Sequence, residues 1–300
     1  MDEKKDYIIA IKYLFVIFLL SFLFAVPVLN LVALILLPVP IVFLVVRLDS
    51  KLSFAVIVLA ALINGLLLGT VIGLYTIIVF GLIGFTFGLA LKEGFSSIKV
   101  LLLVIAAVLI STVIIYYLVG GINSGYFEEQ LEQQMEIMGQ QYPQLFQMQN
   151  VDPEMFINLY LETVKLLFPA IVVISSIILG SIIYYITLWY LNRKGFDFKS
   201  FKSLKYWFLP RWWTAAGLTF ALIFKTNQYG LNAVIILFFL IYVQGMAVGY
   251  YYLAQADSKA VNFIYFVFVF FSSIMFIGII VLIAVGLIDM WFNLRKLKSV

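Results

Sequence analysis

Apolar residues fill this chain in runs that are longer than the ~18 residues that mark a candidate membrane-spanning helix. The run 8–46 has Lys12 as its single charged residue, and the run 52–91 has none. A helix rises ~1.5 Å per residue, so about 20 apolar residues cross the ~30 Å hydrocarbon core of a bilayer. Each run is long enough for two such helices. The chain is therefore expected to fold in lipid and to cross the membrane several times.

Composition favours membrane helices over other architectures. Hydrophobic residues make up 65% of the chain and charged residues 11%, whereas about 25% of the residues of a soluble domain are charged. Strands of a membrane β-barrel alternate apolar and polar residues over about 10 positions, and the runs here show no such alternation. The sequence predicts an all-α fold, a polytopic transmembrane helical bundle.

Breaks between the apolar runs predict eight spans. Proline removes a backbone donor, so Pro27 is expected to separate the first two spans, and Pro38 and Pro40 to interrupt the second. Spans are expected at 8–26, 29–46, 98–119, 230–254 and 261–288, with two within 52–91 and one from near 152 to 191 that contains Pro169. If the segment 206–224 also crosses the membrane, the chain has nine spans. If this segment is re-entrant or interfacial, the chain has eight spans, and the distribution of cations between the two sides favours eight.

The segment 120–164 is the one sizeable polar stretch, and it divides the chain into three parts. It contains seven carboxylates and no Lys or Arg. Apolar residues recur at helical spacing over 126–140, which predicts an amphipathic helix there. The expected organisation is an N-terminal membrane bundle of about five helices over 1–119, an acidic extracytoplasmic helical segment over 120–164, and a C-terminal membrane bundle over 165–300.

Lysine and arginine concentrate in alternate loops, which predicts the orientation of the chain. Lys4, Lys5 and the basic loop 193–211 are expected in the cytoplasm, and this leaves 120–164 outside. The net charge of +4 comes from such helix-end cations. It is therefore no indication of nucleic-acid binding.

The residue types that carry most enzyme chemistry are missing. The chain has no Cys and no His, which removes thiolate nucleophiles, the commonest metal ligand and the commonest general base near neutral pH. No acid or base lies at the centre of a predicted span, and no glycine-rich phosphate loop is present. The sequence predicts no enzyme activity, no catalytic or metal-binding residue and no cofactor.

Two kinds of residue inside the predicted spans are candidate sites. Small-xxx-small patterns let helix backbones approach closely, and the expected helix-packing glycines are Gly65, Gly69, Gly73, Gly84, Gly88, Gly245 and Gly249. The amides Asn64 and Gln244 each precede such a pattern. Because an amide in hydrocarbon needs a partner, each either bonds to a neighbouring helix or lines a polar cavity for a small solute.

The end of the last predicted span carries further polar residues. Asp289 lies beside Trp291 and is expected at the membrane boundary. Arg295, Lys296 and Lys298 follow, and they are expected to anchor the span, with binding of anionic lipid as the alternative.

Four segments of the chain resemble the YybS-like family of bacterial multi-pass membrane proteins. They are Leu36–Pro40, Trp207–Arg211, Gln244-Gly245 and Gly286–Phe292. The resemblance implies a bacterial cytoplasmic-membrane protein. The N-terminal part of that family is similar to the substrate-binding components of energy-coupling-factor vitamin transporters and to the cell-shape protein MreD.

Two functional hypotheses follow from these features. The first is an integral membrane protein that binds a small solute or acts as a transport-type component. The alternative is a membrane scaffold or assembly protein that acts through helix packing and extracytoplasmic contacts, as the resemblance to MreD implies. The expected partners are the lipid bilayer and either a solute or another membrane protein.

Overall fold

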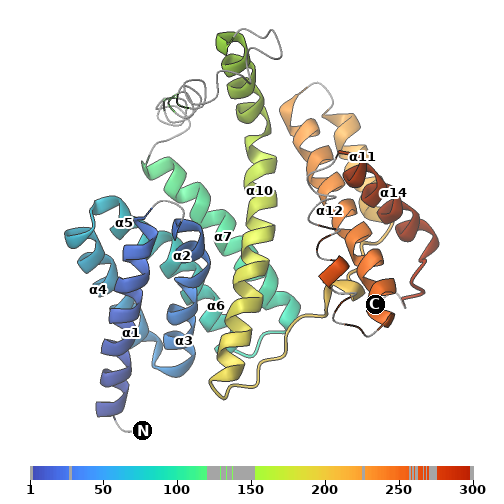
Figure 1. Cartoon of the computed structure of the whole chain (residues 1–300). Coiled ribbons are helices and arrows are strands. Elements are labelled where there is room, and N and C mark those ends of the chain that lie inside the picture. Colours follow the sequence, from blue (N-terminus) through green and yellow to red (C-terminus); the bar gives the residue numbers. More distant parts are fainter. Residues whose placement is uncertain are drawn as a thin grey trace. The chain divides into compact units, whose positions relative to one another are not determined.

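The computed structural model of the chain is shown in Figure 1. It describes residues 3–26, 29–119, 153–224, 227–256 and 276–297, with isolated residues between 129 and 137 and between 258 and 269. Every regular element within these residues is a helix, which confirms the all-α fold. The chain forms two compact units. Unit 1 comprises Met1–Glu162 and Ser175–Phe201, and unit 2 comprises Thr163–Ile174 and Lys202–Val300.

The first helices of unit 1 show how proline divides an apolar run. Helix α1 covers Glu3–Phe24, α2 covers Leu29–Leu36 and α3 covers Pro38–Arg47. Pro38 stands at the first position of α3, where its missing N–H leaves no helical hydrogen bond unmade. The predicted interruption of the second span by proline is confirmed, and the break falls at Leu37.

The next run folds into a hairpin with an irregular second arm. Helix α4 covers Ser50–Leu67, and the second arm consists of α5 (Thr70–Leu74), the π-helical segment η1 (Tyr75–Gly81) and α6 (Leu82–Lys92). The carboxylate of Asp49 caps α4 by accepting a hydrogen bond from the N–H of Lys51 at 2.9 Å. This bond holds the pKa of Asp49 below its usual value. Helix α7 (Ser97–Val119) follows.

One long helix supplies residues to both units. Helix α10 covers Pro153–Arg193, 41 residues with Pro169 inside it. Its start at Pro153 agrees with the span that the sequence predicts from near 152. The prediction for 126–140 falls almost entirely outside the described residues.

Unit 2 contains helices that differ in whether they are long enough to cross a membrane. Its elements are the turn η2 (Leu204–Tyr206), α11 (Trp212–Ile223), α12 (Gln228–Leu253), the turn η3 (Ala254–Ala256) and α14 (Phe276–Phe292). Seven helices in the described residues are long and apolar enough to cross a membrane, and α14 is a shorter apolar helix. The 12 residues of α11 extend about 18 Å, well short of the ~30 Å core. This length agrees with the eight-span prediction.

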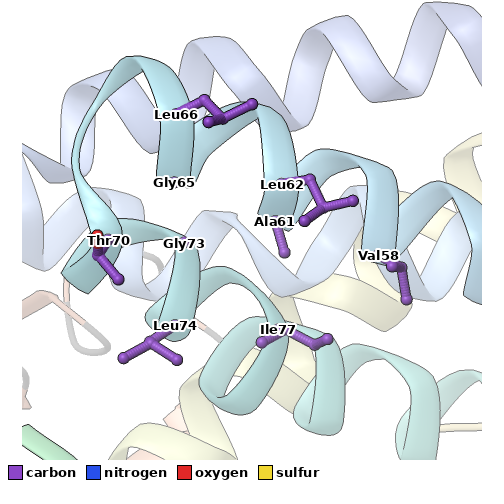
Figure 2. A pocket seen from close by; sticks show the side chains of 9 residues that line it. All are labelled: Val58, Ala61, Leu62, Gly65, Leu66, Thr70, Gly73, Leu74 and Ile77. Atoms are coloured by element: carbon purple, nitrogen blue, oxygen red, sulfur yellow. The ribbon is translucent and has the colours of Figure 1, made fainter.

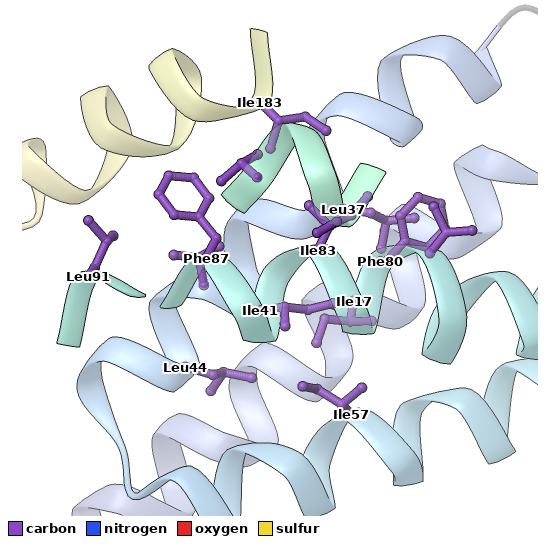
Figure 3. Close-up of a cluster of buried hydrophobic side chains, with 14 of the residues drawn as sticks. Ile17, Leu37, Ile41, Leu44, Ile57, Phe80, Ile83, Phe87, Leu91 and Ile183 are labelled. Atoms are coloured by element: carbon purple, nitrogen blue, oxygen red, sulfur yellow. The ribbon is translucent and has the colours of Figure 1, made fainter. Parts of the chain in front are cut away.

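The core of unit 1 is built by close approach of α3 and α6. Figure 3 shows buried side chains of these helices, among them Ile41 of α3 and Phe87 of α6, and Ile41 lies beside Ile17 of α1. A Cβ atom on Gly84 would lie 2.6 Å from the Cβ of Ile41. A Cβ on Gly88 would likewise collide with Val45. Both glycines therefore let α6 pack against α3 of the same chain.

Candidate functional site

Unit 1 buries a polar cluster formed by Ser21, Asn64 and Thr76, which we call the Asn64 cluster. All three side chains are fully buried. The amide nitrogen of Asn64 donates hydrogen bonds to the Ser21 hydroxyl at 2.8 Å and to the Thr76 hydroxyl at 2.9 Å. The cluster therefore joins α1, α4 and η1 through a single amide.

The carbonyl oxygen of Asn64 is buried and has no hydrogen-bond partner among the residues that the structure describes. Ser21 donates its hydroxyl proton to the Ile17 carbonyl and Thr76 donates its own to the Ile72 carbonyl, so neither proton is left for Asn64. Exchanging the amide oxygen and nitrogen would leave both N–H groups of the amide without acceptors. Two unsatisfied donors cost more free energy than one unsatisfied acceptor, so the orientation shown is the favoured one. A buried acceptor without a donor costs about 1–3 kcal/mol. The Asn64 oxygen can therefore accept a hydrogen bond from a donor outside the cluster.

Irregular backbone on both sides brings Thr76 to Asn64. Gly69 forms the turn between α4 and α5 with a φ of +107°, a conformation that side-chain-bearing residues rarely adopt. Thr76 lies in η1, and π-helical turns occur frequently at functional sites. A Cβ on Gly73 would lie 2.7 Å from the Cα of Gly65. Gly65 and Gly73 thus let the two arms of the hairpin touch, whereas Gly69 makes the turn.

An apolar groove lies on this hairpin, as Figure 2 shows. Its volume is about 330 Å³. The residues that line it are Val58, Ala61, Leu62, Gly65, Leu66, Thr70, Gly73, Leu74 and Ile77. Asn64 and Gln244 do not line this groove. Thr70 is its single side chain with a hydroxyl group, so the groove suits an apolar molecule.

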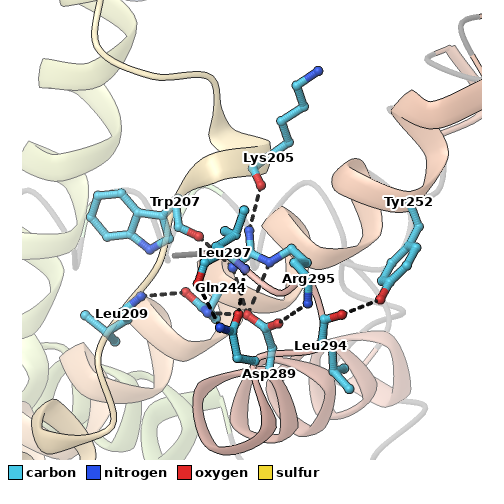
Figure 4. A network of polar contacts seen from close by, with 10 residues as sticks. Lys205, Trp207, Leu209, Gln244, Tyr252, Asp289, Leu294, Arg295 and Leu297 are labelled. Carbon is cyan, nitrogen blue, oxygen red and sulfur yellow. Dashed lines mark hydrogen bonds and ion pairs between the residues drawn. The ribbon is translucent and has the colours of Figure 1, made fainter. Parts of the chain in front are cut away.

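Unit 2 buries a second polar cluster, formed by Gln244, Asp289 and Arg295, which we call the Asp289 cluster (Figure 4). Asp289 and Arg295 form an ion pair at 2.8 Å, and both side chains are fully buried. The Gln244 amide nitrogen donates to the same carboxylate oxygen of Asp289 at 2.5 Å. The sequence-predicted residue Gln244 therefore lies against a buried charge.

The Asp289 cluster holds a loop through backbone groups. The Arg295 guanidinium donates to the carbonyl oxygens of Lys205 at 2.7 Å and Trp207 at 2.6 Å. The Gln244 side-chain oxygen accepts from the N–H of Leu209 at 2.8 Å. Each polar side-chain atom of Gln244, Asp289 and Arg295 thus has a hydrogen-bond partner, as a buried ion pair requires.

Arg295 is the member of this cluster that sequence reasoning missed. The sequence predicts Asp289 at the membrane boundary and Arg295 in a tail that anchors the last span, whereas the structure pairs the two with both side chains buried. Asn293, with a φ of 46°, turns the chain where α14 ends, and the Arg295 N–H also reaches Asp289. In the sequence, the local signal of this return is an Asn, a residue type that tolerates positive φ, between an acid and a base six positions apart.

Two glycines bring the helices of the Asp289 cluster together. A Cβ on Gly245 would overlap the carbonyl oxygen of Leu282, and one on Gly286 would overlap the carbonyl oxygen of Ile241. Helices α12 and α14 therefore meet backbone to backbone beside Gln244. The predicted packing residue Gly249 faces the ring of Tyr265 instead.

The helices and their buried polar clusters define a polytopic α-helical membrane protein. Residues 13–290 match the family described as Predicted membrane protein (DUF2232), and the chain belongs to this family. No curated protein and no solved structure matches the chain. Three of the four segments that carry the resemblance to the YybS-like family, Trp207–Arg211, Gln244-Gly245 and Gly286–Phe292, contribute to the Asp289 cluster or to the helix contact beside it.

Proposed function

We propose that this protein binds a small solute in unit 1 and serves as a transport-type component of a bacterial cytoplasmic membrane. The similarity to energy-coupling-factor substrate-binding components belongs to the same proposal. The main support is the carbonyl oxygen of Asn64, which lies buried beside a π-helical segment and has no donor within the described part of the chain. Interrupted helices in membrane proteins free polar groups to line binding sites.

The chemistry of unit 1 suggests the kind of solute. An O–H or N–H group of the solute would satisfy the Asn64 oxygen. The apolar groove lies on the same two helical arms, since Gly65 of its lining follows Asn64 directly and Ile77 follows Thr76. Its volume of about 330 Å³ lies within the range of small-molecule sites, roughly 300–1,000 Å³. A largely apolar molecule with one donor group fits both features.

The test compares two variants that each lose a buried polar side chain of α4. Asn64→Ala removes the orphaned oxygen, whereas Ser53→Ala removes a hydroxyl whose one proton already has acceptors, the carbonyls of Leu44 and Asp49. Mass spectrometry of the purified proteins is expected to find a co-purified small molecule with the wild type and Ser53→Ala, and to find it depleted with Asn64→Ala. Equal retention by both variants, or no small molecule with the wild type, would overturn the proposal.

The orientation is part of the proposal. The positive-inside bias puts the N-terminus in the cytoplasm and 120–164 outside. The chain has no Cys, so a maleimide can label this protein only at a cysteine that is introduced. Single cysteines at Lys4 and Glu129 therefore show on which side of the membrane each position lies. A membrane-impermeant maleimide applied to whole cells is expected to label the second position and not the first, and the reverse pattern would refute this orientation.

The alternative function, a scaffold or assembly protein similar to MreD, needs helix faces that are open to a partner. Gly84, Gly88 and Gly245 pack against their own chain, so these faces give it less support. The scaffold function would then depend on the segment 126–140 as the contact with a partner protein. Cross-linking from cysteines introduced there separates the two functions, because a specific protein partner supports the scaffold and a bound solute supports transport. Neither function includes a catalytic step.

A further inference from the structure

A band of cations and aromatic rings covers the loop that the Asp289 cluster holds. Its members, which we call the headgroup surface, are Lys205, Tyr206, Arg211, Trp212, Trp213 and Lys296. The rings are open, with exposed fractions of 46% for Tyr206, 58% for Trp212 and 42% for Trp213. The two tryptophan rings stack at 4.7 Å, and the Lys205 ammonium lies 5.2 Å from the centre of the Tyr206 ring.

The buried ion pair brings the C-terminal tail to this loop. Arg295 bonds to the carbonyls of Lys205 and Trp207, so the exposed Lys296 that follows it lies beside the loop. Figure 4 shows the side chain of Lys205 directed away from the cluster. The stretches 202–213 and 289–297 contain one acid, Asp289, and Arg295 already matches its charge. The surface that the two stretches form is therefore positively charged.

The neighbouring helix fixes the depth of this surface in the membrane. Helix α11 begins at Trp212 and continues with apolar residues that are open to the surroundings, among them Leu218, Leu222 and Ile223. Such side chains belong in hydrocarbon, whereas tryptophan prefers the level of the lipid headgroups. Cations next to the tryptophan pair therefore lie at the depth of the lipid phosphates. A soluble partner would leave the apolar face of α11 in water.

We propose that the headgroup surface binds the headgroup of an anionic phospholipid. Lys205, Arg211 and Lys296 would contact the phosphate, and the tryptophan pair would set the depth of the site. Each cation near an anionic membrane surface strengthens binding about five-fold. The buried pair of Asp289 and Arg295 acts as a positioning element, because it joins the tail cation to the loop.

The experiment titrates detergent-purified full-length protein with phosphatidylglycerol or phosphatidylcholine and counts bound lipids by native mass spectrometry. Phosphatidylglycerol is expected to bind more tightly. The variant K205Q/R211Q/K296Q is expected to lose this preference, with an affinity for phosphatidylglycerol that is lower by roughly 100-fold. K4Q/K5Q/K12Q removes three cations from unit 1 and is the matched control, which is expected to retain the preference.

A charge-retaining variant separates loss of binding from loss of folding. K205R/K296R keeps both charges and is expected to bind phosphatidylglycerol as the wild type does. Equal affinity of the wild type for both lipids would overturn the proposal. So would equal losses in the glutamine variant and the unit 1 control, because the effect would then be one of net charge.

Discussion

The side-chain oxygen of Asn232 accepts a hydrogen bond from the backbone N–H of Ala170 at 2.7 Å. The amide nitrogen of the same Asn232 donates to the carbonyl of Leu166 at 2.8 Å. A regular helix would pair this N–H and this carbonyl with each other. Pro169 lies between them and opens the helix, so the Asn232 amide occupies the opened turn of α10.

Replacing Asn232 with Leu is expected to destabilise the protein by about 1–2 kcal/mol, because two backbone groups lose their partner in an apolar surrounding. Amide hydrogen exchange at Ala170 should become faster. The variant P169A/N232L restores a helix-forming residue at the kink, so much of the loss should return. Thermal unfolding in detergent measures both effects, and equal stability of N232L and the double variant would contradict this role.

Breaking the buried ion pair is expected to cost more than removing it. Arg295→Gln leaves the Asp289 carboxylate buried without its cation and should destabilise the protein by about 3–5 kcal/mol. D289N/R295Q removes both charges and should be more stable than R295Q alone. Chemical unfolding of the three proteins tests this order. A double variant less stable than R295Q would show that the charges do not act as a pair.

The backbone contact between α12 and α14 makes Gly245 and Gly286 sensitive to a single methyl group. Gly245→Ala or Gly286→Ala drives a Cβ into a carbonyl oxygen, and overpacking of this kind costs about 1–3 kcal/mol. Gly249→Ala is the control, because its Cβ would meet the ring of Tyr265 at 3.0 Å, a side chain that can move. Melting temperatures should fall further for the first two variants than for the control.

The capping bond of Asp49 predicts a dependence on pH. Its pKa lies below the ordinary value of 3.8 because the carboxylate accepts the Lys51 N–H. The stabilisation of α4 by this bond is therefore complete above the ordinary value and is lost as the pH falls through the lowered one. Asp49→Asn should flatten this acidic branch of the stability profile. If the variant loses stability at acidic pH as the wild type does, this loss comes from other carboxylates and the prediction is wrong.

Apolar runs and prolines predict the helices, because spanning length and a missing N–H act locally. The break before Pro38 and the start of α10 at Pro153 follow from such signals. The π-helical turn at Tyr75–Gly81 carries no comparable signal, since it depends on how the two hairpin arms pack. The pairing of Gln244 with Asp289 spans 45 positions. Each residue could be singled out by its polarity, but their meeting depends on where α12 crosses α14.

The long helix α10 has a consequence for the connectivity of the protein. Residues 163–174 of this helix belong to unit 2, whereas the stretches on either side of them belong to unit 1. No single cut of the chain can therefore release two complete units. A fragment that starts at Lys202 would contain Asn232 but lack the backbone groups of Leu166 and Ala170 that it binds. The two units are interleaved along the sequence. We therefore expect them to fold together and not as separately expressed fragments.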